Sequence, residues 1–248
     1  INNERLIAAE KSLIKLTNKK KLTNLSFLDI GCGSGLSSLA ALKLNCKKIY
    51  SIDQDKDSIE TTKKVLRLSG KKNFKIEKKD LFDLSEKEKF DVVYSWGVLH
   101  HTGKMYDAII KSTKMLKHNG VLILALYKKT KLCSLWKIEK LFYKSAPRII
   151  QNFLKFIFIN LFRLAMFIKG KSFSNYLKNY KKKRGMDFFH DVHDWLGGYP
   201  YESISFEEMQ KFMKKNNFKM IRSFQVKKQL GLFGTGCDEY VFTKRQVK

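Results

Sequence analysis

A glycine-rich turn between an apolar segment and a helix-forming segment constrains this chain more than any other feature of its sequence. The segment 25–30 is mainly apolar and contains Asp29, and glycines follow at alternate positions, Gly31, Gly33 and Gly35. Glycine suits a backbone that adopts a positive φ angle or lies directly against a ligand. A helix that begins after such a turn points its first N–H groups at whatever lies above it. The pattern predicts a strand, a tight turn and a helix that cradle a nucleotide-like ligand.

An acidic residue ends the next strand-like segment. Residues 48–52 read Lys-Ile-Tyr-Ser-Ile and precede Asp53. An acidic side chain at this place in an α/β unit is positioned to bind a ribose. The dinucleotide-binding fingerprint reads G-x-G-x-x-G, whereas this chain reads D-x-G-x-G-x-G, with the third glycine one position earlier. The spacing therefore argues against a nicotinamide-dinucleotide domain.

Strand-like and helix-like segments alternate along the first half of the chain. We expect strands at 25–30, 48–52, 73–77, 90–95 and 120–126, and helices at 4–17, 35–44, 56–68 and 104–117. Such alternation implies a parallel sheet. Asn119-Gly120 predicts a turn before the fifth strand. Residues 131–183 contain no strand-like segment, and the chain then returns to a helix at 205–216 and strands at 218–226 and 239–244.

Several motifs, in a fixed order, resemble those of class I S-adenosylmethionine-dependent methyltransferases. Besides the glycine turn they are Ile52-Asp53-Gln54, Lys79-Asp80-Leu81-Phe82, the segment 90–101 and the segment 116–126. The resemblance covers residues 20–127 and 205–244. It implies a Rossmann-like α/β fold with a seven-stranded sheet, mostly parallel, whose last strand is antiparallel. It also implies S-adenosylmethionine as cofactor, held by Asp29, Gly31, Cys32, Gly33, Gly35, Asp53, Gln54, Asp80, Leu81, Ser95 and Trp96.

The same resemblance divides the chain into three parts. We expect a cofactor-binding core at 1–127, a helical insertion at 128–204 that forms part of the acceptor site, and a C-terminal helix and strand hairpin at 205–248 that completes the core.

The insertion contains a long apolar segment, 148–169, which raises the question of a membrane helix. Lys155 and Arg163 lie within it, and each is costly at a bilayer centre. Its polar residues fall on one half of a helical wheel, so the segment is amphipathic. We favour a helix packed on the domain as a lid or dimer surface. The alternative is a helix lying in a membrane interface.

The acceptor site is expected beyond the carboxyl ends of the strands, as in other open α/β sheets. This rule places it near 96–101 and near Tyr127. Histidine is the side chain best suited to accept a proton near neutral pH. His100 and His101 are therefore candidates, and the resemblance to related methyltransferases favours His101.

The segment 184–202 holds the densest group of polar and aromatic side chains. His190 and His193, with Asp191 and Asp194, have a spacing that can ligate a metal on a helix. They can equally form a hydrogen-bonded network that shapes an acceptor pocket, and we expect the network and no metal. The catalytic candidates are His100, His101, Tyr127, Arg184, His190 and His193.

Composition bounds the cellular setting. The chain has 248 residues, with 50 Lys and Arg against 23 Asp and Glu, a net charge of +27. A field of this sign attracts anionic molecules, although scattered lysines can also reflect genome composition. The cysteines, Cys32, Cys46, Cys133 and Cys237, show no C-x-x-C pairing, and no signal peptide is visible. We expect a cytoplasmic protein, peripheral at the membrane if 148–169 binds lipid, and a homodimer if that segment is a dimer surface.

A narrower resemblance concerns the acceptor. Gly-Gly-Tyr-Pro-Tyr-Glu at 197–202 and Gly-Cys-Asp-Glu-Tyr at 236–240 resemble segments of small-molecule O-methyltransferases from bacterial surface-polysaccharide (capsule) gene clusters, including those proposed to methylate a phosphoramidate. This implies O-methylation of a small anionic metabolite or sugar-linked group. One alternative is a membrane-associated quinone-type O-methyltransferase. A third is an RNA methyltransferase, which the charge alone favours; we expect no stable nucleic-acid partner.

Overall fold

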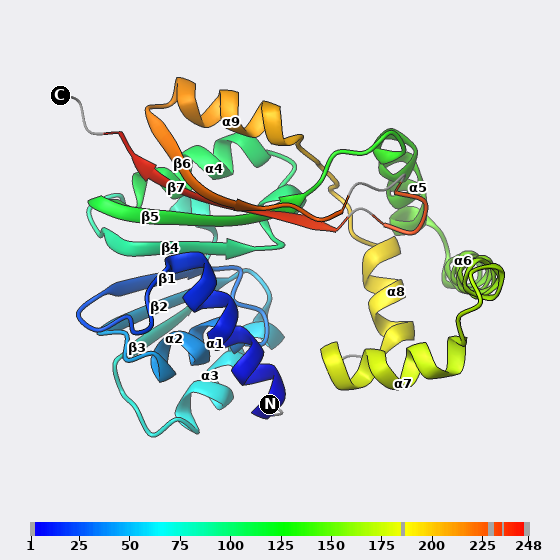
Figure 1. Cartoon of the computed structure of the whole chain (residues 1–248), viewed down its shortest axis with the longest axis horizontal. Coiled ribbons are helices and arrows are strands. Elements are labelled where there is room, and N and C mark those ends of the chain that lie inside the picture. Colours follow the sequence, from blue (N-terminus) through cyan, green and yellow to red (C-terminus); the bar gives the residue numbers. More distant parts are fainter. Residues whose placement is uncertain (1–2, 185–186, 228–230, 235, 246–248) are drawn as a thin grey trace.

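The structure, a computed structural model, describes residues 3–184, 187–227, 231–234 and 236–245. Its centre is a seven-stranded sheet (Figure 1). The strands are β1 (Ser26–Ile30), β2 (Lys48–Asp53), β3 (Phe74–Lys78), β4 (Phe90–Trp96), β5 (Leu116–Tyr127), β6 (Phe218–Phe224) and β7 (Cys237–Lys244). Their order is β3-β2-β1-β4-β5-β7-β6. Strands β1 to β5 run parallel, and β7 is antiparallel to both of its neighbours. The predicted mixed sheet is confirmed.

Helices cover both faces of the sheet. On one face lie α1 (Asn3–Thr17), α2 (Leu36–Lys43) and α3 (Lys56–Arg67); on the other lie α4 (Met105–Lys114) and α9 (Phe206–Lys215) (Figure 1). The side chains of β5 show why both faces are buried. Ile123 packs into the cluster beneath α1 and α2, whereas its neighbours Leu122 and Leu124 pack with α4 and α9. Side chains on a strand alternate between faces, so a central strand flanked by two layers must be apolar throughout.

The predicted turn at Asn119-Gly120 is wrong. Helix α4 ends at Lys114, three residues before the expected end, and β5 begins at Leu116 and runs through both residues. Leu116 already pairs with Phe90 of β4, and the register then shifts, since the next pair is Val92 with Val121. A Cβ atom on Gly120 would lie 3.0 Å from the Phe90 carbonyl oxygen. Glycine at this position therefore permits a close approach of two strands rather than a turn.

A helical insertion follows β5 and extends the molecule beyond one end of the sheet (Figure 1). Its helices are α5 (Cys133–Ser145), α6 (Arg148–Ile168), α7 (Phe173–Arg184) and α8 (Phe188–Leu196). We call these four helices the lid. They share a small core of their own, in which Tyr143, Phe188 and Val192 are buried. The two connections to the sheet lie side by side, since Lys128 and Ile204 form a parallel bridge. The expectation of a helical insertion after the fifth strand is confirmed.

Candidate active site

The glycine turn after β1 is closed on one side and open on the other. Gly31 has a φ of 73°, and a Cβ atom there would lie 2.4 Å from a methyl group of Val98, so any other residue would strain the backbone and displace Val98. Gly33 also has a positive φ, but a Cβ atom on it would meet nothing within 4 Å. The turn is therefore packed against Val98 and presents bare backbone above Gly33, as a ligand cradle requires.

Asp29 lies beneath this turn and is fully buried. Its Oδ2 accepts a hydrogen bond of 2.5 Å from the Ser38 hydroxyl, and Ser38 is in turn 2.7 Å from the Ser51 hydroxyl. Burial, with a smaller effect from the nearby charge of Asp53, raises the pKa of the Asp29 carboxyl to about 7. A cation bound above the turn would oppose both effects, because it favours the carboxylate.

Asp53, at the end of β2, faces the same turn. Its Oδ2 accepts the Gly33 N–H at 2.9 Å, and its Oδ1 accepts the Asp55 N–H at 2.9 Å. Next to it, Gln54 Nε2 donates to Asp80 Oδ2 at 2.6 Å, and Asp80 caps the short helix η1 (Leu81–Asp83). The ends of β2 and β3 thus bring together the polar groups expected to bind a ribose and an adenine.

A cavity of about 190 Å³ opens over the turn. Its walls include Asp29, Gly31, Cys32, Gly33, Tyr94 and Trp96. The thiol of Cys32 is neutral, since burial raises its pKa to about 12. An open backbone cradle between two carboxylates fits a cationic nucleoside. Tyr94, whose hydroxyl accepts from Ser37 at 3.3 Å, was not anticipated, because a tyrosine in a buried strand has no distinguishing sequence signal.

Two of the expected cofactor residues lie elsewhere. Ser95 is 1% exposed, and its hydroxyl donates to the Ile30 carbonyl at 3.1 Å, so it ties β4 to β1. Leu81 packs into the core under α4. Side chains alternate between the two faces of β4, so Ser95 points away from the face on which Tyr94 and Trp96 lie.

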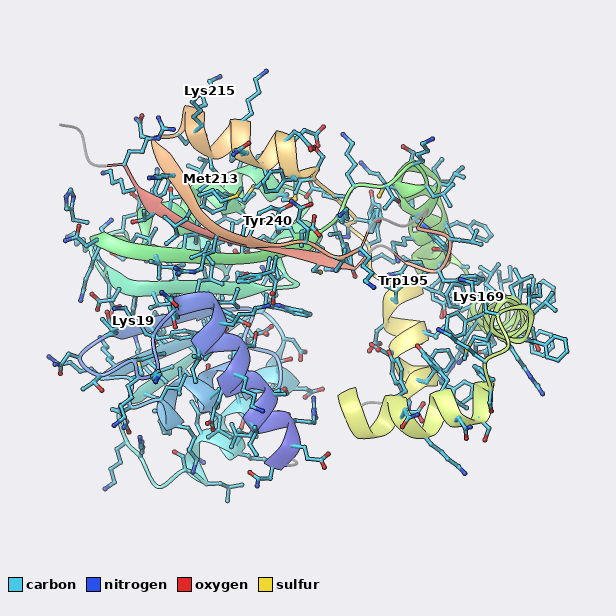
Figure 2. The ribbon with its side chains drawn as sticks, viewed as in Figure 1. Lys19, Lys169, Trp195, Met213, Lys215 and Tyr240 are labelled. Carbon is cyan, nitrogen blue, oxygen red and sulfur yellow. The ribbon has the colours of Figure 1, made fainter. Side chains whose placement is uncertain are left out.

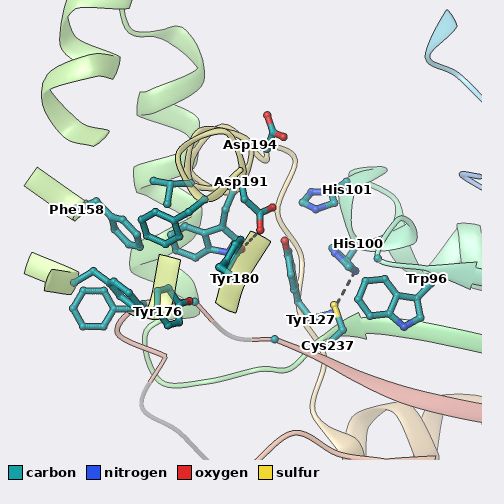
Figure 3. A pocket seen from close by; sticks show the side chains of 18 of the residues that line it. Trp96, His100, His101, Tyr127, Phe158, Tyr176, Tyr180, Asp191, Asp194 and Cys237 are labelled. Atoms are coloured by element: carbon teal, nitrogen blue, oxygen red, sulfur yellow. Dashed lines mark hydrogen bonds between the residues drawn. The ribbon is translucent and has the colours of Figure 1, made fainter. Parts of the chain in front are cut away.

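A second, larger cavity of about 750 Å³ lies between the sheet and the lid (Figure 3). Aromatic side chains supply much of its wall, among them Tyr127, Phe158, Phe162, Tyr180 and Trp195. Trp96, at the end of β4, borders this cavity as well as the smaller one. The Trp96 indole N–H donates to Glu239 Oε1 at 3.1 Å, which fixes the ring. The two cavities therefore meet at a single side chain.

His100 and His101 reach the larger cavity from η2 (Leu99–His101). His101 Nδ1 is 2.8 Å from the Pro200 carbonyl oxygen, which can only accept, so Nδ1 carries the proton and Nε2 the lone pair. His100 Nδ1 instead accepts the Tyr127 N–H at 3.3 Å, which leaves the proton on Nε2. The rings lie 4.4 Å apart and are held in opposite tautomers. Burial lowers the pKa of both imidazoles, most strongly for His100.

The lid contributes carboxylates from α8. Asp191 accepts a hydrogen bond from the Tyr180 hydroxyl, and Asp194 lies on the same side of the helix (Figure 3). Among the described residues, the wall of the larger cavity contains no lysine or arginine. The positive charge of the molecule thus does not extend into this wall.

His190 and His193 do not line the cavity, although they lie on the same helix. Both side chains are exposed, and His193 Nδ1 pairs with the Tyr143 hydroxyl at 2.7 Å. Asp191, Asp194 and Trp195 occupy the cavity-facing side instead. No three His, Cys, Asp or Glu side chains of the described segments gather as metal ligands would. The side chain of Arg184 lies outside the described residues.

A buried lysine supports the cavity wall and was missed by the sequence reasoning. Lys140 on α5 is 0% exposed, donates to the Trp195 carbonyl and lies 3.7 Å from the centre of the Trp195 ring. Burial lowers its pKa and raises that of the adjacent Glu139. One lysine among so many carries no sequence signal for burial.

Comparison with known proteins identifies a methyltransferase domain. A family model described as a methyltransferase domain matches residues 21–190, well over half of the chain. The chain is 34% identical over 119 residues to a ubiquinone biosynthesis O-methyltransferase of Pelagibacter ubique, covering 46% of this chain and 47% of that protein. It is 33% identical over 120 residues to a ribosomal protein L11 methyltransferase of Thermoanaerobacter pseudethanolicus, covering 46% and 36%. The matches span about half or less of these relatives.

The fold also resembles solved structures. The crystal structure of magnesium protoporphyrin IX methyltransferase from Synechocystis with bound SAH aligns with a TM-score of 0.59 at 16% identity, covering 98% of this chain and 84% of that one. At this identity the likeness supports the fold.

The buried Asp29 predicts a pH dependence of stability. Its pKa rises from 3.8 in the unfolded chain to about 7 in the folded one. The contribution of the protonated carboxyl to the stability of the folded protein is fully present below the unfolded pKa of 3.8. It is lost as the pH rises through about 7. We expect Asp29→Asn to raise the free energy of unfolding relative to the unmodified protein at about pH 8 more than at about pH 5.

Chemical denaturation at the two pH values measures this difference. Asp83→Asn, which alters an exposed carboxylate on η1, is the matched control. An Asp29→Asn effect of equal size at both pH values would contradict the raised pKa.

Proposed function

Since the chain belongs to the methyltransferase domain family, we propose that it transfers a methyl group from S-adenosylmethionine to a hydroxyl of an apolar, ring-containing acceptor. The observation that carries this proposal is the meeting of the two cavities at Trp96. We assign the cofactor to residues 1–127, the acceptor site largely to the lid within 128–204, and completion of the core to 205–248.

The smaller cavity suits the cofactor. When bound, S-adenosylmethionine supplies an electrophilic methyl group on a sulfonium cation. Gly33 offers backbone without a Cβ atom, and Asp53 is positioned to accept hydrogen bonds from ribose hydroxyls. Asp29 and Asp53 together provide negative charge for the cationic end, while Gln54 and Asp80 provide polar groups toward the base.

His101 is the proposed base. Its Nδ1–H is fixed on the Pro200 carbonyl, so Nε2 is the nitrogen free to take a hydroxyl proton. Burial keeps the imidazole neutral at physiological pH because it lowers the pKa. His100 packs beside it, and its Nε2 is buried without a hydrogen-bond partner among the described residues. Correct positioning against the methyl group then supplies much of the remaining rate.

The wall of the larger cavity favours an uncharged aromatic acceptor. Flat side chains such as Tyr127 and Trp195 stack on rings. The sequence similarity to a ubiquinone biosynthesis O-methyltransferase supports the same class of acceptor. The anionic acceptor expected from composition finds no cationic side chain in the described wall.

A small anionic acceptor, such as a sugar-linked or phosphoramidate group of a capsule, is the second candidate. The net charge of +27 favours it, because it would draw anions toward the molecule. The RNA methyltransferase alternative rests on the same charge alone.

A methyl-transfer panel tests the choice of acceptor. We expect transfer to catechols that carry an apolar chain, and much slower transfer to sugar phosphates and phosphoramidates, because the described wall is aromatic and contains no cation. Radiolabelled methyl transfer at equal acceptor concentrations measures the ratio. Preference for the anionic acceptors would establish the second candidate instead.

Asp53→Ala should weaken S-adenosylmethionine binding by about tenfold to a hundredfold, since it removes a charged hydrogen-bond acceptor. Isothermal titration calorimetry measures the change. Asp57→Ala, an exposed residue in the first turn of α3, is the control. Unchanged affinity in the Asp53 variant would remove this residue from the cofactor site.

His101→Gln should lower kcat by about a hundredfold or more while cofactor affinity stays the same, because glutamine cannot take the proton. In the unmodified protein, kcat/KM should fall as pH drops through an apparent pKa below 6.5, where His101 becomes protonated. His118→Gln, an exposed histidine on β5, is the control. A variant with normal kcat and an unchanged pH profile would show that His101 is not the base.

A further inference from the structure

We propose that the outer face of α6 docks this protein on an anionic lipid bilayer, with the helix lying in the plane of the interface. This inference rests on the exposed side chains of α6 and on their charge. It does not depend on the identity of the acceptor.

The outer face of α6 is apolar and uncovered. Ile149, Phe153, Phe156, Leu164 and Phe167 recur at helical spacing and are all exposed, Ile149 by 83% and Phe167 by 79%. Asn160 interrupts this stripe, but its Nδ2 donates to the Phe156 carbonyl at 2.9 Å. An exposed apolar face of this length marks an interaction surface rather than an ordinary solvated one.

The helix is anchored to the lid by its opposite face. Leu154, Phe158 and Phe162 pack into the lid core, and Phe158 and Phe162 also line the larger cavity. In Figure 2 the helix is seen along its axis at the edge of the molecule, with side chains projecting away from the other lid helices. The outer face therefore points outward while the inner face holds the site together.

Cationic side chains accompany the apolar stripe. Arg148, Lys155 and Arg163 recur at intervals of about two helical turns and so lie along one side of α6. Lys169 and Lys171 follow its end and are exposed. Apolar side chains beside lysine and arginine match the interface of a bilayer with anionic headgroups. The same cations, in a molecule of net charge +27, would repel one another across a face-to-face contact of two copies.

An orientation in which α6 spans the membrane fits the structure less well. By length and composition α6 could cross a membrane, and only 6% of its most apolar window is buried. Crossing would place Lys155 and Arg163 in hydrocarbon. It would also pull Phe158 and Phe162 out of the lid core and open the larger cavity.

Vesicle flotation of the full chain tests the proposal. We expect flotation with phosphatidylglycerol-containing vesicles and much less with phosphatidylcholine alone. Phe156→Glu combined with Phe167→Glu should weaken binding by at least about tenfold, since two exposed phenylalanines lose their burial in the interface. Arg163→Gln should weaken it less and mainly at low salt.

Leu68→Glu is the matched control, because Leu68 is an exposed leucine on the core, far from the lid in sequence. Thermal unfolding and methyl transfer to a soluble acceptor confirm that each variant is folded. Failure to float, equal flotation of the double glutamate variant, or a dimer in light scattering that the double variant disrupts would each overturn the proposal. Because flotation needs no methyl transfer, the two proposals fail separately.

Discussion

The common direction of strands β1 to β5 is the constraint on which the site depends. Parallel strands end at one edge of the sheet, so Asp29, Asp53 and Trp96 meet there although they are far apart in the chain. The glycine turn leaves space at this edge, because glycines have no side chains to fill the region above β1. The Ser38 hydroxyl, which donates to Asp29 and also bonds to the Ser51 hydroxyl, then ties the helix that begins after the turn to the first and second strands.

The spacing of residues along the sequence predicted the strand, the glycine turn and the helix that follow one another around Asp29. The turn from Asp29 to Gly35 and the acidic Asp53 follow from short-range geometry, which a sequence displays directly. The Asn119-Gly120 dipeptide misled, because the strand begins before it, at Leu116, which pairs with Phe90 of β4, and local propensity does not show that distant contact. Ser95 was expected among the cofactor-binding residues but ties β4 to β1, since the sequence of a strand does not state which of its two faces borders a cavity.

The side chains that line or support the larger cavity were predicted less completely, for physical reasons. The sequence of α8 offers two faces, and only packing against α5 and α6 turns Asp191 and Trp195 inward while His190 faces solvent. Lys140 is buried by contacts with Trp195 that join distant segments. Net charge favours an anionic acceptor, but a charge summed over the whole chain does not state which side chains line a cavity.

The lid is one continuous insertion whose two ends, at Lys128 and Ile204, lie side by side. Because both ends of the insertion lie side by side just beyond β5, the helices between them could differ without a change in strand order or in the glycine turn. Such a change would reshape the wall of the larger cavity and leave the smaller cavity over the glycine turn as it is. Trp96 belongs to the sheet and faces both cavities. It therefore limits how far the larger cavity can change without affecting the smaller one.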